Sequence, residues 1–208
     1  MIKRGFNKDD VLAIYLPNVI EYPIIFYGVA FLGGVLSTVN PLYSSQELER
    51  QLRISGAKYV VTIPPLAENA KDAAASAGVG SVFVLGEAPG CESLSSFLSD
   101  DGSAFPEHVQ INTKEDVGAL PFSSGTTGLS KGVMITHYNL VAGLVLLFDN
   151  NVVPDNAIVL NLLPFYHIYA LLVMMGGCLQ VGSKLVLLPR FEPVSFLKAM
   201  QDYKVCFI

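Results

Sequence analysis

The sequence predicts an α/β fold, with layered mixed or parallel sheets and helices on their faces. The first observation is that short apolar runs alternate with longer segments of helical pattern from residue 11 to residue 85. Strand-helix-strand alternation at this spacing is typical of parallel βαβ units. The second is that the 208 residues are 51% hydrophobic and only 15% charged, which is enough apolar surface to bury a core.

The first 85 residues carry clear start and stop signals. Pro17-Asn18 marks a turn, Ser44 or Ser45 followed by Glu47 is a typical helix start, and Gly56 is a typical helix stop. We therefore expect strands at 11–16, 59–63 and 81–85, an extended segment at 37–43, and helices at 19–34, 46–55 and 66–77.

Residues 86–113 break this rhythm, because they are rich in Ser, Gly, Asp and Pro, and we expect a surface excursion with at best a short helix at 93–98. Regular structure should then resume. We expect strands at 116–122, 131–135, 158–163 and 182–188, helices at about 136–150 and 193–203, and the start of a strand at 205–208.

Composition excludes several classes of protein. The net charge of −5 and the lack of a basic cluster give no footprint for nucleic acid. Cys91, Cys178 and Cys206 are far apart and odd in number, which indicates buried thiols in a reducing compartment, with no disulfide framework and no metal-ligand spacing. Residues 22–46 and 156–183 carry no charged side chain, yet prolines, glycines and asparagines interrupt both. We therefore expect strands and buried helices there, with no transmembrane segment.

The segment richest in groups that can bind an anion is SSGTTGLSKGV, residues 123–133, which combines hydroxyls, glycines and one lysine. Glycine lets backbone N–H groups turn toward phosphate oxygens, while hydroxyls and an ammonium add further donors. The segment differs from the general P-loop pattern at two defined positions, so it predicts a phosphate loop of another kind. A flexible Ser/Gly linker is the alternative, although strand-like runs on both sides disfavour it.

This segment resembles the signature loop of the adenylate-forming superfamily, which includes acyl-CoA synthetases, 4-coumarate:CoA ligases and beetle luciferases. The family usually has proline where this chain has Ser130. By that resemblance, the residues that would hold the β- and γ-phosphates of MgATP are Ser123, Ser124, Gly125, Thr126, Thr127, Gly128 and Lys131.

A second resemblance lies in LPFYHIYAL, residues 163–171, which is similar to a motif of 4-coumarate:CoA ligases. A histidine among apolar residues can be a core side chain, but His167 follows a predicted strand, where open α/β sheets bind ligands. The resemblance implies that His167 lies beside the reacting carboxylate, as a catalytic and substrate-binding residue, and that Tyr169 lines the acyl pocket.

Two further positions follow from the same comparison. Val173 stands where the coumarate ligases carry a serine, which leaves a phenolic substrate in question. Arg190 stands where they carry a lysine thought to contact coenzyme A phosphates, and the alternative for Arg190 is a solvated surface cation.

The resemblance implies the α/β portion of an ATP-dependent acyl-CoA ligase, with ATP, Mg²⁺ and coenzyme A as cofactors and a small carboxylic acid as substrate. Residues 1–208 would then be an incomplete N-terminal adenylation domain, without the C-terminal domain and its catalytic lysine, and inactive alone. The alternatives are a fragment of a luciferase-type monooxygenase and a non-catalytic truncated binding module. We expect an intracellular location, cytoplasmic or peroxisomal.

Overall fold

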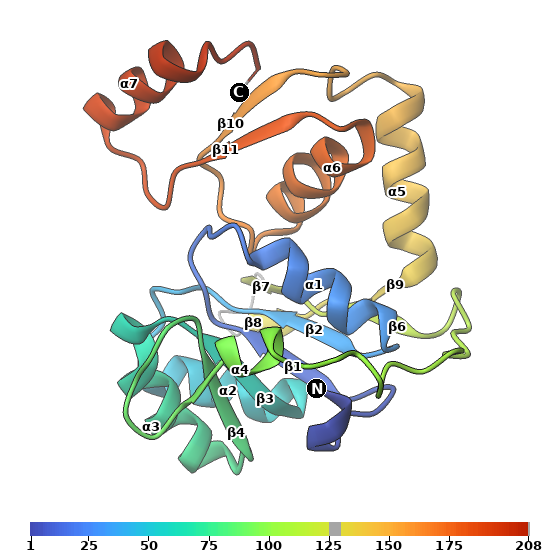
Figure 1. Cartoon of the computed structure of the whole chain (residues 1–208), viewed down its shortest axis with the longest axis vertical. Coiled ribbons are helices and arrows are strands. Elements are labelled where there is room, and N and C mark those ends of the chain that lie inside the picture. The colour runs from blue at the N-terminus through green and yellow to red at the C-terminus, as the bar shows by residue number, and fades with distance from the viewer. Residues whose placement is uncertain (125–129, 208) are drawn as a thin grey trace. The chain divides into compact units, whose positions relative to one another are not determined.

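The computed structural model describes residues 1–124 and 130–207. The chain divides into two compact units. Figure 1 draws the whole chain, coloured by residue number from blue at the N-terminus to red at the C-terminus. Unit 1 comprises Met1–Leu16 and Ile25–His137, and unit 2 comprises Pro17–Ile24 and Tyr138–Ile208.

Within unit 1, the described residues form a sheet of seven strands in the order β5-β4-β3-β1-β2-β6-β9 (Figure 1). Every pairing in this sheet is parallel except that of β6 with β9. The predicted α/β class with a mainly parallel sheet is thus confirmed. The strands are β1 (Val11–Ile14), β2 (Val35–Thr38), β3 (Ala57–Thr62), β4 (Ser81–Val84), β5 (Glu92–Ser93), β6 (Val117–Ala119) and β9 (Ile135–Thr136).

The connections place helices on both faces of this sheet. Because β2 and β3 lie on opposite sides of β1, right-handed crossovers put α1 on one face and α2 and α3 on the other. These helices are α1 (Tyr22–Phe31), α2 (Ser45–Ser55) and α3 (Ala67–Ala77). Three short helices lie between the other elements: η1 (Ile2–Arg4), η2 (Pro64–Leu66) and α4 (Ser95–Leu98).

Helix α2 begins and ends where its sequence predicts. The Ser44 side chain accepts a hydrogen bond from the Glu47 N–H, and the Glu47 carboxylate accepts one from the Ser44 N–H, which completes a capping box. Gly56 ends the helix with a left-handed φ of 66°. Helix α1 is shorter than the predicted 19–34, because Pro23 fits only its first turn and Gly33 takes a φ of 69° beyond its end.

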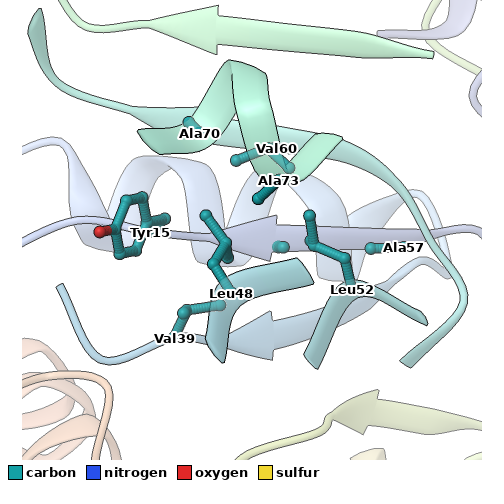
Figure 2. Packing of buried hydrophobic residues seen from close by; sticks show 9 residues of the cluster. Tyr15, Val39, Leu48, Leu52, Ala57, Val60, Ala70 and Ala73 are labelled. Atoms are coloured by element: carbon teal, nitrogen blue, oxygen red, sulfur yellow. The ribbon is translucent and has the colours of Figure 1, made fainter. Parts of the chain in front are cut away.

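The core of unit 1 lies between the sheet and the pair α2 and α3, as Figure 2 shows. Leu48 and Leu52 of α2 and two alanines of α3 pack on side chains from β1 and β3, and each of these side chains is almost fully buried. The cluster consists of Ala13, Tyr15, Val39, Leu48, Leu52, Ala57, Val60, Ala70 and Ala73. Leu12 and Ile14 on the other face of β1 are buried too, as expected for a sheet covered on both sides.

The strand predicted at 116–122 is split in the structure. β6 ends at Ala119, and the chain continues into β7 (Phe122–Ser124), which pairs with β8 (Ser130–Gly132) in a separate antiparallel hairpin. Pro121 lies at the break, where its missing N–H cannot continue the ladder. The strand predicted at 131–135 is divided likewise between β8 and β9.

Unit 2 is built around two parallel strands, β10 (Ile158–Asn161) and β11 (Lys184–Leu187). Phe207 adds an isolated parallel bridge to Val159, at the strand start predicted for 205–208. The helices of the unit are α5 (His137–Asp149), the π-helix η3 (Ala170–Gly177), α6 (Cys178–Val181) and α7 (Pro193–Tyr203). Among the described residues, no helix is both long enough and apolar enough to cross a membrane.

Candidate functional site

The β7–β8 hairpin holds both ends of the segment predicted to bind phosphate. Ser123 is opposite Lys131 and Ser124 is opposite Ser130, and the Ser130 hydroxyl donates a hydrogen bond of 3.2 Å to the Ser123 carbonyl. The flanking β structure predicted for this segment is therefore present. The connecting residues include Gly125, Thr126, Thr127 and Gly128, and they lie outside the described part of the chain.

Gly132 lets the hairpin lie against its own base. A Cβ at this position would come within 3.2 Å of Leu120 Cδ1 and within 3.3 Å of the Phe122 ring. Contacts that short are tighter than nearly all real Cβ contacts, so a larger residue would push these side chains away. A glycine here thus permits the close packing that fixes the strand carrying Lys131.

The hairpin presents donors that suit an anion. The Ser123 and Lys131 side chains are exposed, and Lys131 makes no ion pair with any described residue. An ammonium and a hydroxyl on adjacent strands are a donor set that fits phosphate oxygens. No set of three or more His, Cys, Asp or Glu side chains that could hold a metal ion occurs among residues 1–124 and 130–207.

A pocket of 240 Å³ lies beside the hairpin in unit 1. It is smaller than ligand pockets usually are, at about 300–1,000 Å³, so it cannot enclose a whole nucleotide. Its lining comes from Tyr43, from α2 and from the base of the hairpin: Tyr43, Glu47, Arg50, Gln51, Ile54, Phe122 and Ser130.

His167 lies in the turn that follows β10 in unit 2. The backbone N–H of His167 donates to the Pro164 carbonyl at 3.0 Å. Its ring nitrogen Nδ1 accepts a hydrogen bond of 3.3 Å from the backbone N–H of Tyr169. Because Nδ1 accepts, the neutral imidazole carries its proton on Nε2. The His167 side chain is exposed, so this Nε2–H is a hydrogen-bond donor available to a ligand.

The other predicted residues of unit 2 differ in exposure. Tyr169 is 51% exposed, whereas Val173 is 9% exposed and lies on the π-helix η3, an element that the sequence pattern does not predict. Arg190 is exposed and follows β11 by three residues, close enough to Glu192 to help lower the pKa of that carboxyl. The main cause of the lowered Glu192 pKa is its hydrogen bonds from Ser195 at the start of α7.

The structure thus divides the predicted residues into two groups. Ser123, Ser124 and Lys131 belong to the hairpin of unit 1, whereas His167, Tyr169, Val173 and Arg190 belong to unit 2. Within unit 2, His167 and Arg190 follow the carboxyl ends of two paired parallel strands, which is where open α/β sheets bind ligands.

Beneath the His167 turn lies a buried aromatic pair. The rings of Tyr22 and Phe165 are 5.4 Å apart between centroids, and both side chains are at most 1% exposed. The Tyr22 hydroxyl has no hydrogen-bond partner among the described residues, and burial raises its pKa far above the ordinary value. Asn18, expected only as part of a turn, also reaches this segment: its buried amide donates to the Leu163 carbonyl. Nothing in the local sequence signals that long-range contact.

A family model described as AMP-binding enzyme matches residues 1–208. The chain belongs to the AMP-binding enzyme family. The family predicted from the segment at 123–133 is thus confirmed. Among the curated members of this AMP-binding family, the chain is similar to 4-coumarate–CoA ligase 1 of Petroselinum crispum, with 36% identity over 208 residues. That alignment covers 98% of this chain and 38% of the ligase, so the chain spans well under half the length of this relative.

Solved structures of similar proteins agree with the family fold. A long-chain-fatty-acid-CoA ligase from Archaeoglobus fulgidus matches with a TM-score of 0.86 and 30% identity, over 98% of this chain and 40% of that one. A red-emitting luciferase from Phrixothrix hirtus matches with a TM-score of 0.87 and 26% identity, over 98% and 41%. The fold of this AMP-binding family member is therefore common to ligases and luciferases.

Proposed function

We propose that this chain is the part of an acyl-CoA ligase that binds the phosphates of ATP and the carboxylic acid. The supporting observation is the 36% identity to a 4-coumarate–CoA ligase across almost the whole chain. The luciferase is 26% identical, so sequence similarity favours the ligase over a luciferase-type monooxygenase. Because the chain spans 38% of that ligase, we also propose that residues 1–208 are an incomplete N-terminal adenylation domain.

The reaction has two steps. A carboxylate oxygen attacks the α-phosphorus of ATP, the bond to pyrophosphate breaks, and an acyl-adenylate forms. The sulfur of coenzyme A then attacks the acyl carbonyl, AMP leaves, and the thiol proton is released. Transfers of this kind depend mainly on positioning and on neutralising charge.

We propose that the hairpin of unit 1 binds the departing pyrophosphate. Lys131 would neutralise part of its charge, Ser123, Ser124 and the connecting Gly125, Thr126, Thr127 and Gly128 would add donors, and Mg²⁺ would arrive bound to the phosphates. The side chains of Lys131 and Ser123 fit this role because both are exposed. In addition, the Lys131 ammonium makes no ion pair with any described residue.

The residues of unit 2 would bind the acid and coenzyme A. His167 would donate through Nε2–H to an oxygen of the reacting carboxylate, which the acceptor role of Nδ1 supports. Tyr169 and Val173 would line the acyl pocket, and Arg190 would contact a coenzyme A phosphate. We propose an intracellular location, cytoplasmic or peroxisomal, in keeping with three free cysteines.

The test is acid-dependent release of pyrophosphate from ATP over a panel of carboxylic acids, measured on the protein at its native length, without substitution and with Lys131→Ala or Lys198→Ala. Lys198 is an exposed lysine on α7 and serves as the matched control. Loss of one charge-assisted contact of about 1.5–3 kcal/mol should lower kcat/KM of Lys131→Ala by about 10- to 150-fold. An unchanged rate would contradict the assignment of the hairpin.

The same experiment separates the alternatives. Light emission with oxygen would favour the luciferase-type enzyme. Binding of ATP without pyrophosphate release would indicate either a non-catalytic module or a chain that needs further sequence. The intact mass in the native source distinguishes these two, because a mass well above 22.4 kDa supports an incomplete domain of a larger ligase.

A further inference from the structure

One buried amide in unit 2 contacts both segments that follow β10 and β11 and lead to His167 and Arg190. Asn18 Nδ2 donates to the Leu163 carbonyl at 2.9 Å and to the Leu188 carbonyl at 3.3 Å. Its Oδ1 accepts a hydrogen bond of 2.9 Å from the Phe165 N–H. Asn18 is only 7% exposed, so water does not readily replace these contacts.

The chemistry of these three contacts requires a carboxamide. Two carbonyls need two N–H donors, and the Phe165 N–H needs an acceptor, which a single asparagine side chain supplies together. An aspartate in this place could accept but not donate, and its charge would face two carbonyl oxygens. The three contacts are made to segments about 145 and 170 residues further along the chain.

The residues that Asn18 contacts lie close in sequence to His167 and Arg190. Phe165 is two residues before His167, and the Pro164 carbonyl between the two contact points accepts the His167 N–H at 3.0 Å. Leu188 is two residues before Arg190, and its own N–H donates to the Asn161 carbonyl at 3.0 Å.

A second asparagine completes this arrangement. Asn161, the last residue of β10, is fully buried; its Nδ2 donates to the Leu163 carbonyl at 3.0 Å and its Oδ1 accepts from the Leu163 N–H at 3.2 Å. Asn161 therefore shapes the turn after β10 locally. The Asn18 side chain hydrogen-bonds both to this turn and to the segment after β11, whereas the link from Asn161 to Leu188 is made by its backbone carbonyl.

We propose that Asn18 is a positioning residue, which fixes the segment carrying His167 relative to the segment carrying Arg190. This inference rests on the proposed function, because it assumes that His167 and Arg190 act on one substrate complex. Without the amide, the His167 turn loses two contacts that hold Leu163 and Phe165. The Nε2–H of His167 then has no fixed direction, while the hairpin of unit 1 keeps its own contacts.

The experiment compares Asn18→Asp, Asn18→Ser and the control Asn150→Ser. Asn18→Asp keeps the shape and loses both donors, and Asn18→Ser avoids a buried charge if the first variant fails to fold. Asn150 is a suitable control because its Nδ2 also donates to a carbonyl, that of Leu146 at 2.7 Å, but at the exposed end of α5.

The first readout is hydrogen exchange at the Phe165 amide, which needs no activity. We expect exchange about tenfold faster in Asn18→Ser, with the amides of α7 unchanged. The second readout is the kinetics of acid-dependent pyrophosphate release, well below the unfolding temperature. We expect kcat to fall by about 10- to 100-fold, because misplacement of a group by about 1 Å costs that much. The KM for ATP should change less than about twofold, because uniform ATP binding is untouched.

Three results would overturn the proposal. Unchanged exchange at Phe165 would mean that Asn18 does not hold the turn. Faster exchange with an unchanged kcat would mean that the residue is only structural. Equal effects of Asn150→Ser would mean that the loss is not specific to Asn18. If the protein at its native length releases no pyrophosphate with any acid, the proposed function fails instead, and the exchange result still decides whether Asn18 holds the turn.

Discussion

Removal of the Tyr22 hydroxyl, by Tyr22→Phe, is expected to stabilise the protein. The side chain is fully buried, and its hydroxyl makes no hydrogen bond with any described residue. In the unfolded chain water satisfies that hydroxyl, so folding carries an uncompensated desolvation cost. Phenylalanine keeps the ring and its packing on Phe165, at 5.4 Å between centroids, and removes the cost.

The magnitude follows from the burial of the hydroxyl. Burying an unpaired hydroxyl costs about 1–3 kcal/mol by mutational data, so the free energy of unfolding should rise by about that much. Tyr15→Phe is the matched control, because its hydroxyl donates a hydrogen bond of 2.6 Å to the Tyr43 carbonyl. Loss of that bond should lower the stability by about 1 kcal/mol, so one chemical change should give opposite signs.

The assay is thermal unfolding followed by circular dichroism. For a chain of 208 residues, each kcal/mol should move the melting temperature by about 2–4 °C. As a second check, burial raises the pKa of Tyr22 far above its ordinary value, so Tyr22→Phe should leave the ultraviolet titration of the folded protein unchanged. A lower melting temperature in Tyr22→Phe would refute the reasoning, because it would mean that the hydroxyl has a partner.

Three further predictions concern other parts of the chain. Gly34→Ala should destabilise the protein by about 1–3 kcal/mol, because the added Cβ would overlap the buried Phe6 ring; chemical denaturation measures this loss. Ser44→Ala should cost about 1 kcal/mol in the same assay, because it removes the N-cap of α2. Burial raises the pKa of the Cys178 thiol to about 11, so iodoacetamide at pH 8 should modify exposed Cys206 well before Cys178, as peptide mass spectrometry would show.

Gly28→Ala, on α1 with open space around its Cβ, should stabilise by about 0.5–1 kcal/mol, so a loss there would mean that the argument from space is wrong. A Ser44→Ala variant as stable as the original would show that the capping box contributes nothing.

The raised pKa of the Cys178 thiol also makes stability depend on pH, because the unfolded chain loses this proton at a lower pH than the folded protein does. The free energy of unfolding should therefore fall as the pH rises from about 9 to about 11. Equal labelling of Cys178 and Cys206 would contradict the burial of Cys178.

Much of unit 1 could be predicted because its signals are local. Apolar runs of strand length mark β1, β3 and β4, and the Ser44 to Glu47 spacing marks the start of α2. Each signal involves neighbours in the sequence, and the long-range packing agrees with it. The segment around Lys131 was predictable for the same reason, because its hydroxyls, glycines and lysine are contiguous.

The features that sequence reasoning missed depend on distant contacts. The two halves of the strand split at Pro121 pair with different partners, β6 with β2 and β7 with β8. The π-helix η3 has no periodic pattern that separates it from an ordinary buried helix. The neighbouring sequence predicts only that Asn18 lies in a turn. Its three hydrogen-bond partners are about 145 to 170 residues further along the chain. A single sequence therefore names candidate site residues but not the long-range contacts that hold them.

During synthesis, the four central strands of the sheet in unit 1 leave the ribosome before its other three strands, β5, β6 and β9. β1 lies between β2 and β3, and β4 joins the outer side of β3, so residues up to Val84 already contain four neighbouring strands. The β1–β2 pairing closes over α1 and the β3–β4 pairing over η2 and α3, whereas the β1–β3 pairing closes over α1, β2 and α2. Because the entropy of loop closure grows only slowly with loop length, the longer β1–β3 closure costs little more than the other two. The nascent chain can thus bury Leu48 and Leu52 before β6 to β9 emerge. The β7–β8 hairpin is added after these strands, so substitutions within it should not slow the folding of that nucleus.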